Sequence, residues 1–185
     1  MSHTEIEVRF LEIDADKLIA KLRTLGAKDL GEELLEELIF RDSDDTWTKL
    51  GKRVRLRKSK GRVLLAYKET LALTADGTKE IEFEVGSFED AAALLESIGL
   101  VGGRRQEKRR HSFKLGNVAV EIDRWPKIPA LVELEGSNEE ELKEAAQKLG
   151  LSWENVEMRN ALRVIEEVYK IPVSTYSIYT FDKAG

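Results

Sequence analysis

Seven short runs of this chain alternate charged and apolar residues with a period of two. In the first, EIEVRF from Glu5, the charged residues are Glu5, Glu7 and Arg9. Because successive side chains of a β-strand point to opposite faces, each run predicts a strand with one ionic and one apolar face. The other runs are KRVRLRK from Lys52, VLLAYKE from Val63, KEIEFEV from Lys79, KRRHSFKL from Lys108, VAVEID from Val118 and LVELE from Leu131.

Between these runs, apolar residues recur at helical spacing. Residues 33–42 (ELLEELIFRD) fit a helix or a strand, and we interpret them as a strand because they end in Phe-Arg-Asp before a turn. Ser87 and Ser137 can cap the helices that follow them. With 3 Pro and no linker, residues 1–185 favour one α+β domain, in which 151–185 form a C-terminal helix and tail. The spacing predicts helices over residues 14–25, 87–98, 137–149 and about 155–169.

Composition excludes several classes of function. The absence of Cys removes disulfides and thiolate metal sites, and 2 His argue against a His-based triad. A net charge of -5 argues against nucleic-acid binding. No apolar run approaches the roughly 18 residues of a membrane span, and the N-terminus has no secretory pattern. We therefore expect a cytoplasmic protein, with neither nucleic acid nor membrane as partner, whose chemistry depends on carboxylates, Arg and Lys.

The charged faces separate by sign from strand to strand. Glu-x-Glu runs at 5–7, 80–82 and 133–135 are purely acidic, and the Arg-x-Arg-x-Arg run at 53–57 is purely basic. A sheet with water on its charged face is the simplest interpretation, because half-solvated strands are common. The segregation favours a different one, because like charges two residues apart repel unless something pairs with them. On the pattern alone both interpretations stay open.

In the second interpretation the sheet closes and its charged face lines a lumen, with the helices outside. A lumen of ligand size needs about eight strands. Its nine acidic and seven basic residues give a formal charge of -2, which two divalent ions would change to about +2. Carboxylates suit Mg²⁺ or Mn²⁺, and Arg and Lys suit phosphate oxygens. The ligand of such a lumen would be a metal–polyphosphate.

These runs, in this order, resemble the CYTH family, also called triphosphate tunnel metalloenzymes. Glu5-Ile6-Glu7-Val8-Arg9 stands in place of the family's Glu-x-Glu-x-Lys hallmark. The remaining family motifs are an Arg strand, a Lys strand, a central acidic strand, a Lys-x-Arg-x-x-Tyr pattern, an Ile-Asp strand and a final Glu-Ile-Glu. They resemble residues 54–57, 65–68, 79–85, 108–113 (with Phe for Tyr), 121–123 and 133–135.

The resemblance implies an eight-stranded antiparallel β-tunnel with a charged lumen, helices packed outside, and two Mg²⁺ or Mn²⁺ ions. It implies catalytic roles for Arg9, Glu82 and Asp123. The metal ligands that it implies are Glu5, Glu7, Asp123, Glu133 and Glu135. The residues that it implies for binding the triphosphate are Arg9, Arg55, Arg57, Lys68, Lys108 and Arg110, to which strand parity adds Arg53.

The implied function is a metal-dependent triphosphatase acting on tripolyphosphate, thiamine triphosphate or a nucleoside triphosphate. One alternative is a class IV adenylyl cyclase, which converts ATP to cyclic AMP and pyrophosphate. Another is a non-catalytic polyphosphate- or nucleotide-binding module, because Arg9 stays protonated and cannot accept a proton as the hallmark Lys could.

Some residues are expected to lie outside the lumen or have no assigned role. We expect His111 to point away from the lumen, since it shares the parity of Phe113 on its strand. Arg104 is expected in a solvated loop beside Gly102 and Gly103. Residues 173–181 could form an extra strand, a plug or an edge that would permit a homodimer.

Overall fold

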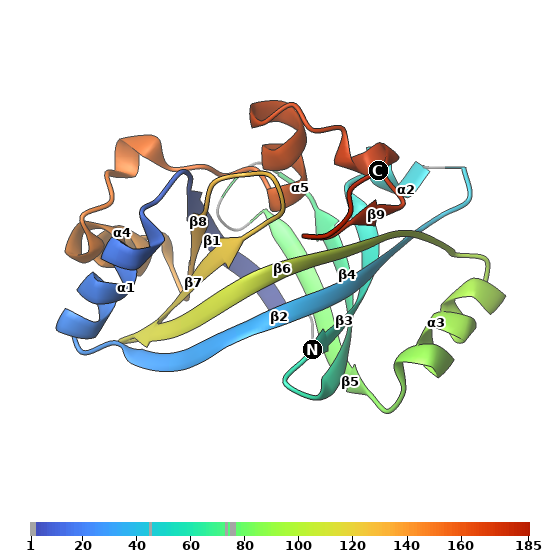
Figure 1. Cartoon of the computed structure of the whole chain (residues 1–185), viewed down its shortest axis with the longest axis horizontal. Coiled ribbons are helices and arrows are strands. Elements are labelled where there is room, and N and C mark those ends of the chain that lie inside the picture. Colours follow the sequence, from blue (N-terminus) through green and yellow to red (C-terminus); the bar gives the residue numbers. More distant parts are fainter. Residues whose placement is uncertain (1–2, 45, 73, 75–76) are drawn as a thin grey trace.

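Eight strands pair antiparallel in one curled sheet (Figure 1). The computed structural model describes residues 3–44, 46–72, 74 and 77–185, without the side chains of residues 3–5 and 78. The strand order is β2-β3-β4-β5-β1-β8-β7-β6, and β2 pairs with β6 as well as with β3. The strands are β1 (His3–Phe10), β2 (Lys28–Arg41), β3 (Lys52–Ser59), β4 (Arg62–Thr70), β5 (Thr78–Val85), β6 (Val101–Leu115), β7 (Val118–Arg124) and β8 (Leu131–Gly136).

The α+β class and all seven predicted strands are confirmed, and the ambiguous residues 33–42 belong to β2. The alternation of charged and apolar side chains along these strands explains why the sheet curls. Helices cover the apolar face over much of the sheet, although Phe83 of β5 stays exposed, while the ionic faces turn toward one another. His111, on the outer face of β6, lies 2.7 Å from Asp29 Oδ1 and stacks on Phe113.

Three of the predicted helices form close to their predicted limits. They are α1 (Ala15–Thr24), α3 (Phe88–Ser97) and α4 (Glu139–Leu149). Ser87 caps α3, as predicted, by accepting from the backbone N–H of Asp90. The prediction for α4 was wrong by one residue, because Asn138 is the cap and the Ser137 hydroxyl donates to Glu141 instead. A further short helix, α2 (Thr46–Lys49), precedes β3.

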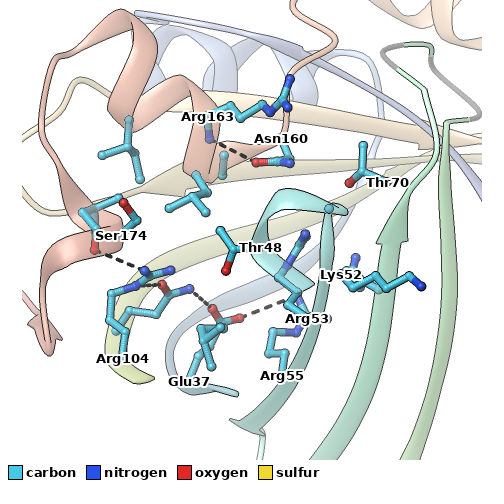
Figure 2. Close-up of a pocket in the computed structure, with 18 of the residues that line it drawn as sticks. Glu37, Thr48, Lys52, Arg53, Arg55, Thr70, Arg104, Asn160, Arg163 and Ser174 are labelled. Atoms are coloured by element: carbon cyan, nitrogen blue, oxygen red, sulfur yellow. Dashed lines mark hydrogen bonds and ion pairs between the residues drawn. The ribbon is translucent and has the colours of Figure 1, made fainter. Parts of the chain in front are cut away.

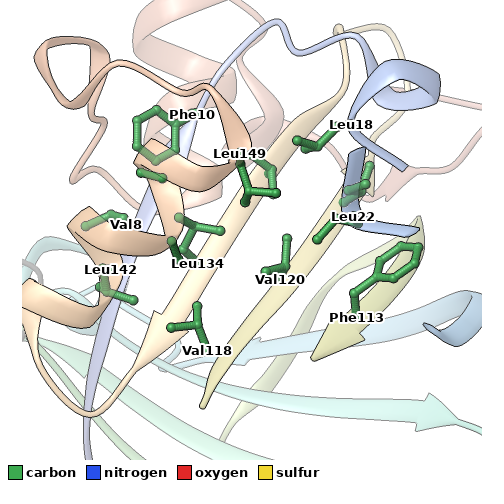
Figure 3. Packing of buried hydrophobic residues seen from close by; sticks show 14 residues of the cluster. Val8, Phe10, Leu18, Leu22, Phe113, Val118, Val120, Leu134, Leu142 and Leu149 are labelled. Carbon is green, nitrogen blue, oxygen red and sulfur yellow. The ribbon is translucent and has the colours of Figure 1, made fainter. Parts of the chain in front are cut away.

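The helices cover two separate parts of the outer face. One core lies between β1, β7, β8 and the helices α1 and α4, with Val8, Leu134 and Leu142 fully buried (Figure 3). A second lies under α3, where Ala91 and Leu95 contact Phe40 and Leu56. Burial of these apolar faces is the main stabilising contribution and leaves the opposite, ionic faces as the interior of the curl. Within the described residues no helix is long and apolar enough to cross a membrane.

The C-terminal segment departs from the predicted helix over 155–169. Its helical part begins only at α5 (Ala161–Arg163) and continues as a π-turn over Val164–Val168. The chain before α5 is extended, because Glu157 exchanges backbone hydrogen bonds of 3.0 and 2.8 Å with Arg9 of β1. Of the roles considered for 173–181, the extra strand is found: β9 (Ile178–Tyr179) pairs in parallel with β6.

Candidate functional site

The ionic faces of the strands line a cavity of about 830 Å³ inside the curled sheet. Asp123, predicted as catalytic and metal-binding, is fully buried behind this wall and does not line the cavity. The side chain of Glu5 lies outside the described residues. The other predicted site residues all line the cavity: Glu7, Arg9, Arg53, Arg55, Arg57, Lys68, Glu82, Lys108, Arg110, Glu133 and Glu135.

Arg9 bridges two carboxylates that the resemblance implies as metal ligands. Its Nη2 lies 2.5 Å from Glu7 Oε1, its Nε lies 2.7 Å from Glu133 Oε1, and its Nη1 donates to the carbonyl of Arg159. Burial alone would raise the pKa values of both glutamates, but the charge of Arg9, together with Lys68 beside Glu7 and with Lys108 and Arg110 beside Glu133, lowers them. The charges of the two glutamates outweigh burial and raise the pKa of Arg9. Arg9 is therefore a permanent cation at the acidic part of the cavity.

Glu135 differs from its two neighbours. It stands directly opposite Glu7 in the β1–β8 ladder, and no Lys or Arg nitrogen of the described chain forms an ion pair with it. Partial desolvation and the negative charges of Glu7 and Glu133 raise its pKa. A carboxylate that is crowded by like charges and lacks a cation is a group that a metal ion would neutralise.

Asp123 anchors the two basic residues of β6. Lys108 Nζ lies 2.6 Å from Asp123 Oδ2, and Arg110 forms a fork on both oxygens at 2.6 Å each. Arg110 also bonds Glu133, at 2.5 Å, and Glu121. Burial and then the charge of Arg110 lower the pKa of Lys108, although Asp123 opposes them. Asp123 thus fixes where these cations point into the cavity.

The opposite wall is formed by β3, β4 and β5. Arg55 lies 3.2 Å from Glu80 and 2.9 Å from Glu82, and Arg57 lies 3.1 Å from Glu82. Lys68 lies 2.9 Å from Glu80. The Nε atoms of Arg55 and Arg57 are buried without a hydrogen-bond partner. These donors have no acceptor within the described chain, although buried N–H groups are nearly always bonded.

Several residues of the cavity were not predicted from the sequence. Glu37 on β2 accepts a 2.6 Å hydrogen bond from Gln106, and Gln106 accepts one of 2.8 Å from Arg104. The solvated loop expected for Arg104 was wrong, because residues 101–115 form one continuous strand that buries Arg104 to 8% exposure. Strand parity could have predicted this, because Arg104 and Gln106 point to the same face of β6 as Lys108 and Arg110.

These additions reverse the predicted charge of the lumen. Twelve basic and nine acidic residues of the described chain line the cavity, a formal charge of +3 instead of -2. The additional positive charge comes from residues at the strand ends and at the rim of the cavity, which the alternating runs did not include. Its basic contributors beyond the predicted set are Arg41, Lys49, Lys52, Arg104 and Arg163.

The fit of a divalent metal can be judged from the donors present. Among the described residues no group of three carboxylates is already arranged to hold an ion. Glu7, Glu133 and Glu135 nevertheless supply hard oxygen donors from the paired strands β1 and β8, and Glu135 lacks a cation partner. The donor chemistry therefore fits Mg²⁺ or Mn²⁺, with Arg9 occupying one side of the cluster.

Comparison with known proteins agrees with this arrangement. A Methanocaldococcus jannaschii protein named "Putative adenylate cyclase" is 24% identical over 170 residues, which cover 86% of this chain and 97% of that protein. A solved structure from Pyrococcus horikoshii is 31% identical, with a TM-score of 0.72 over 84% of this chain and 95% of that one. A Hippeastrum structure, described as revealing a dominant triphosphatase activity, shares the fold at 15% identity, with a TM-score of 0.59 over 91% of this chain and 98% of that one.

The profile of the CYTH domain matches residues 3–161. That match includes all eight antiparallel strands and every carboxylate of the acidic cluster. The chain belongs to the CYTH family.

Proposed function

We propose that this protein is a divalent-metal-dependent triphosphatase that binds its substrate inside a closed β-tunnel. The observation that carries the proposal is the division of one cavity into an acidic cluster of Glu7, Glu133 and Glu135 and a surrounding basic wall. The pairing of β2 with both β3 and β6 supports closure of the sheet. The activity reported for the Hippeastrum relative supports hydrolysis.

In this proposal the basic wall binds the phosphoryl oxygens. Arg55 and Arg57 offer buried Nε–H donors that no protein group accepts. Glu82 holds both guanidinium groups in place, and Asp123 does the same for Lys108 and Arg110. Guanidinium groups held in this way stabilise negative charge on the transferred phosphoryl group without reorganising during the reaction.

The acidic cluster would hold two ions through Glu7, Glu133 and Glu135, to which the family resemblance adds Glu5. When bound there, divalent ions neutralise phosphoryl charge and make a bound water acidic enough to attack. Arg9 orients Glu7 and Glu133. It does not accept the proton of the attacking water, because its pKa is raised by those two glutamates against the effect of burial.

A class IV adenylyl cyclase is the second candidate, and the name of the Methanocaldococcus relative favours it. A cyclase must hold the adenosine of ATP as well as its phosphates. In the described wall of the cavity the aromatic residues are Phe40 and Trp125, and Phe40 is fully buried. The Trp125 ring stacks on Tyr179, and Lys108 Nζ lies over it, 5.0 Å from its centroid. Neither offers an open face for a base, which favours hydrolysis.

The test is a product assay with tripolyphosphate, thiamine triphosphate and ATP, each with Mg²⁺ and with Mn²⁺. Orthophosphate as the main product would support the triphosphatase, and pyrophosphate in step with cyclic AMP would replace it with the cyclase. Glu133→Gln should abolish turnover, whereas Glu84→Gln, an exposed residue of β5 outside the cavity wall, should leave it unchanged. Tight binding without any product would indicate the non-catalytic binding module.

A further inference from the structure

The cations of the cavity differ in whether a carboxylate already neutralises them. Each of the six basic residues that the family resemblance implies forms at least one ion pair of 3.2 Å or less. Arg53 also lines the cavity, but within the described residues it forms no ion pair and no hydrogen bond through its side chain. Burial and then the charge of Arg55 lower its pKa. A desolvated, unpaired cation in a cavity is a position that an anion would stabilise.

Arg104 is a second cation that forms no ion pair with a carboxylate of the described residues. Its Nε donates to the neutral Gln106 amide oxygen at 2.8 Å, and its Nη1 to the carbonyl of Val173 at 3.1 Å. Among acids, Glu166 raises its pKa most, but one Glu166 oxygen accepts the backbone N–H of Ser174 at 2.7 Å. Burial lowers the pKa of Arg104 to about 10, with the charge of Arg53 among the contributing causes.

Both residues line the part of the cavity drawn in Figure 2, on either side of Glu37. Arg104 pairs with Ile39, which pairs with Arg55, so Arg104 and Arg55 flank the same residue of β2. Arg53 lies two residues further along β3, about 7 Å from Arg55 at the usual rise of a strand. Thr70, on the neighbouring strand, contributes a buried hydroxyl with no partner.

We propose that Arg53 and Arg104, with the Thr70 hydroxyl, form a separate phosphoryl subsite next to the basic residues that the proposed function assigns to the triphosphate. This inference rests on the proposed function and adds a substrate class to it: linear inorganic polyphosphates of four or more phosphoryl groups. A nucleoside would place an uncharged sugar and base against two desolvated cations, which gives neither of them a counter-charge. A fourth phosphoryl group would give both a charge-assisted hydrogen bond.

Binding of inorganic anions without metal tests the subsite independently of catalysis. Tetrapolyphosphate and tripolyphosphate are titrated calorimetrically in chelator-treated buffer of fixed ionic strength. We expect the wild-type protein to bind tetrapolyphosphate roughly tenfold more tightly, the effect of about one hydrogen bond to a charged group. Arg53→Gln should reduce this ratio to about one. It should fold normally, because no protein group loses a partner when Arg53 is replaced.

Two further variants make the result specific. Arg53→Lys keeps the charge and should keep most of the preference. Arg62→Gln removes an exposed Arg of β4, outside the cavity wall, and should change neither affinity. A ratio unchanged in Arg53→Gln, or no preference in the wild type, would overturn the subsite while leaving turnover of tripolyphosphate, and so the proposed function, intact. A preserved preference without turnover in metal would overturn the proposed function and support the subsite. Failure of the wild-type protein to bind either anion would overturn the subsite, whereas turnover with metal would still decide the proposed function.

Discussion

The guanidinium of Arg9 lies with its Nε 2.7 Å from Glu133 Oε1, where the family resemblance implies a metal ion beside that carboxylate. Its Nη2 reaches Glu7 at 2.5 Å, so one side chain neutralises carboxylates from both β1 and β8. Its third contact, to the Arg159 carbonyl, ties this cation to the C-terminal segment. Arg9 therefore acts as a built-in cation that keeps the acidic cluster folded without a metal.

Arg9→Ala tests this role. Removing the guanidinium leaves Glu7 and Glu133 buried without their main counter-charge, which should lower the free energy of unfolding by about 3–5 kcal/mol in metal-free buffer. Millimolar Mn²⁺ should then raise the melting temperature of Arg9→Ala more than that of the wild type, since binding to the folded state stabilises it. Arg9→Lys should fall between the two, because it keeps the charge but offers one nitrogen where Arg9 uses three.

The control for this comparison is Arg62→Ala, which removes an exposed Arg whose closest carboxylate, Glu84, is 4.0 Å away. Its stability and its response to Mn²⁺ should match those of the wild type, because exposed pairs contribute little. Equal Mn²⁺ shifts in Arg9→Ala and the wild type would show that Arg9 and the metal do not occupy the same carboxylates.

Asp123→Asn should uncouple the basic residues of β6. The change keeps the side-chain shape but removes the charge that faces Lys108 and Arg110, both at 2.6 Å. Two buried cations then lose their shared partner, and we expect a loss of about 3–5 kcal/mol in the free energy of unfolding, measured in urea. Glu121→Gln is the matched control, because Glu121 also pairs with Arg110 but is 22% exposed. Equal losses in the two variants would contradict the anchoring role of Asp123.

Strand parity predicted the cavity wall well where alternation is strict. Glu7 and Arg9 of β1 and the alternating charged residues of β3 and β8 reach the cavity as expected. On β2 the doubled apolar and acidic pairs Leu34-Leu35 and Glu36-Glu37 hide the period, so Glu37 was not assigned to a face. Strand parity also predicts to which face a side chain points, but not how deeply that side chain is buried. Asp123 points inward as predicted, yet Lys108 and Arg110 cover it.

The C-terminal segment could not be predicted from local pattern, because long-range contacts decide it. Residues 155–169 have helical spacing of apolar side chains, but Val156 and Met158 pack on the first core. Glu157 meanwhile completes a backbone pairing with Arg9, more than a hundred residues earlier. Asn160 caps the helix that begins only after this pairing ends.

The acid stability of the protein should depend on Glu37. Although burial opposes it, the positive charge of Arg55, followed by Lys108 and Arg57, lowers the pKa of Glu37 from about 4.5 to about 2. A folded-state pKa below the unfolded one means that this group stabilises the protein above about pH 4.5. That contribution is lost as the pH falls toward 2, and by linkage it amounts to about 3 kcal/mol.

Glu37→Gln should therefore lower the free energy of unfolding at pH 7 and make its decline between pH 5 and pH 3 shallower than in the wild type. Urea unfolding at half-unit steps of pH measures both quantities. Glu84→Gln provides the exposed control, and its free energy of unfolding should match that of the wild type at every pH. Other carboxylates with lowered pKa values contribute the remaining slope in Glu37→Gln, among them Glu7, Glu133 and Asp29. Parallel curves for Glu37→Gln and the wild type would mean that Glu37 titrates alike in both states, and Arg55 would then be no more than a weak partner.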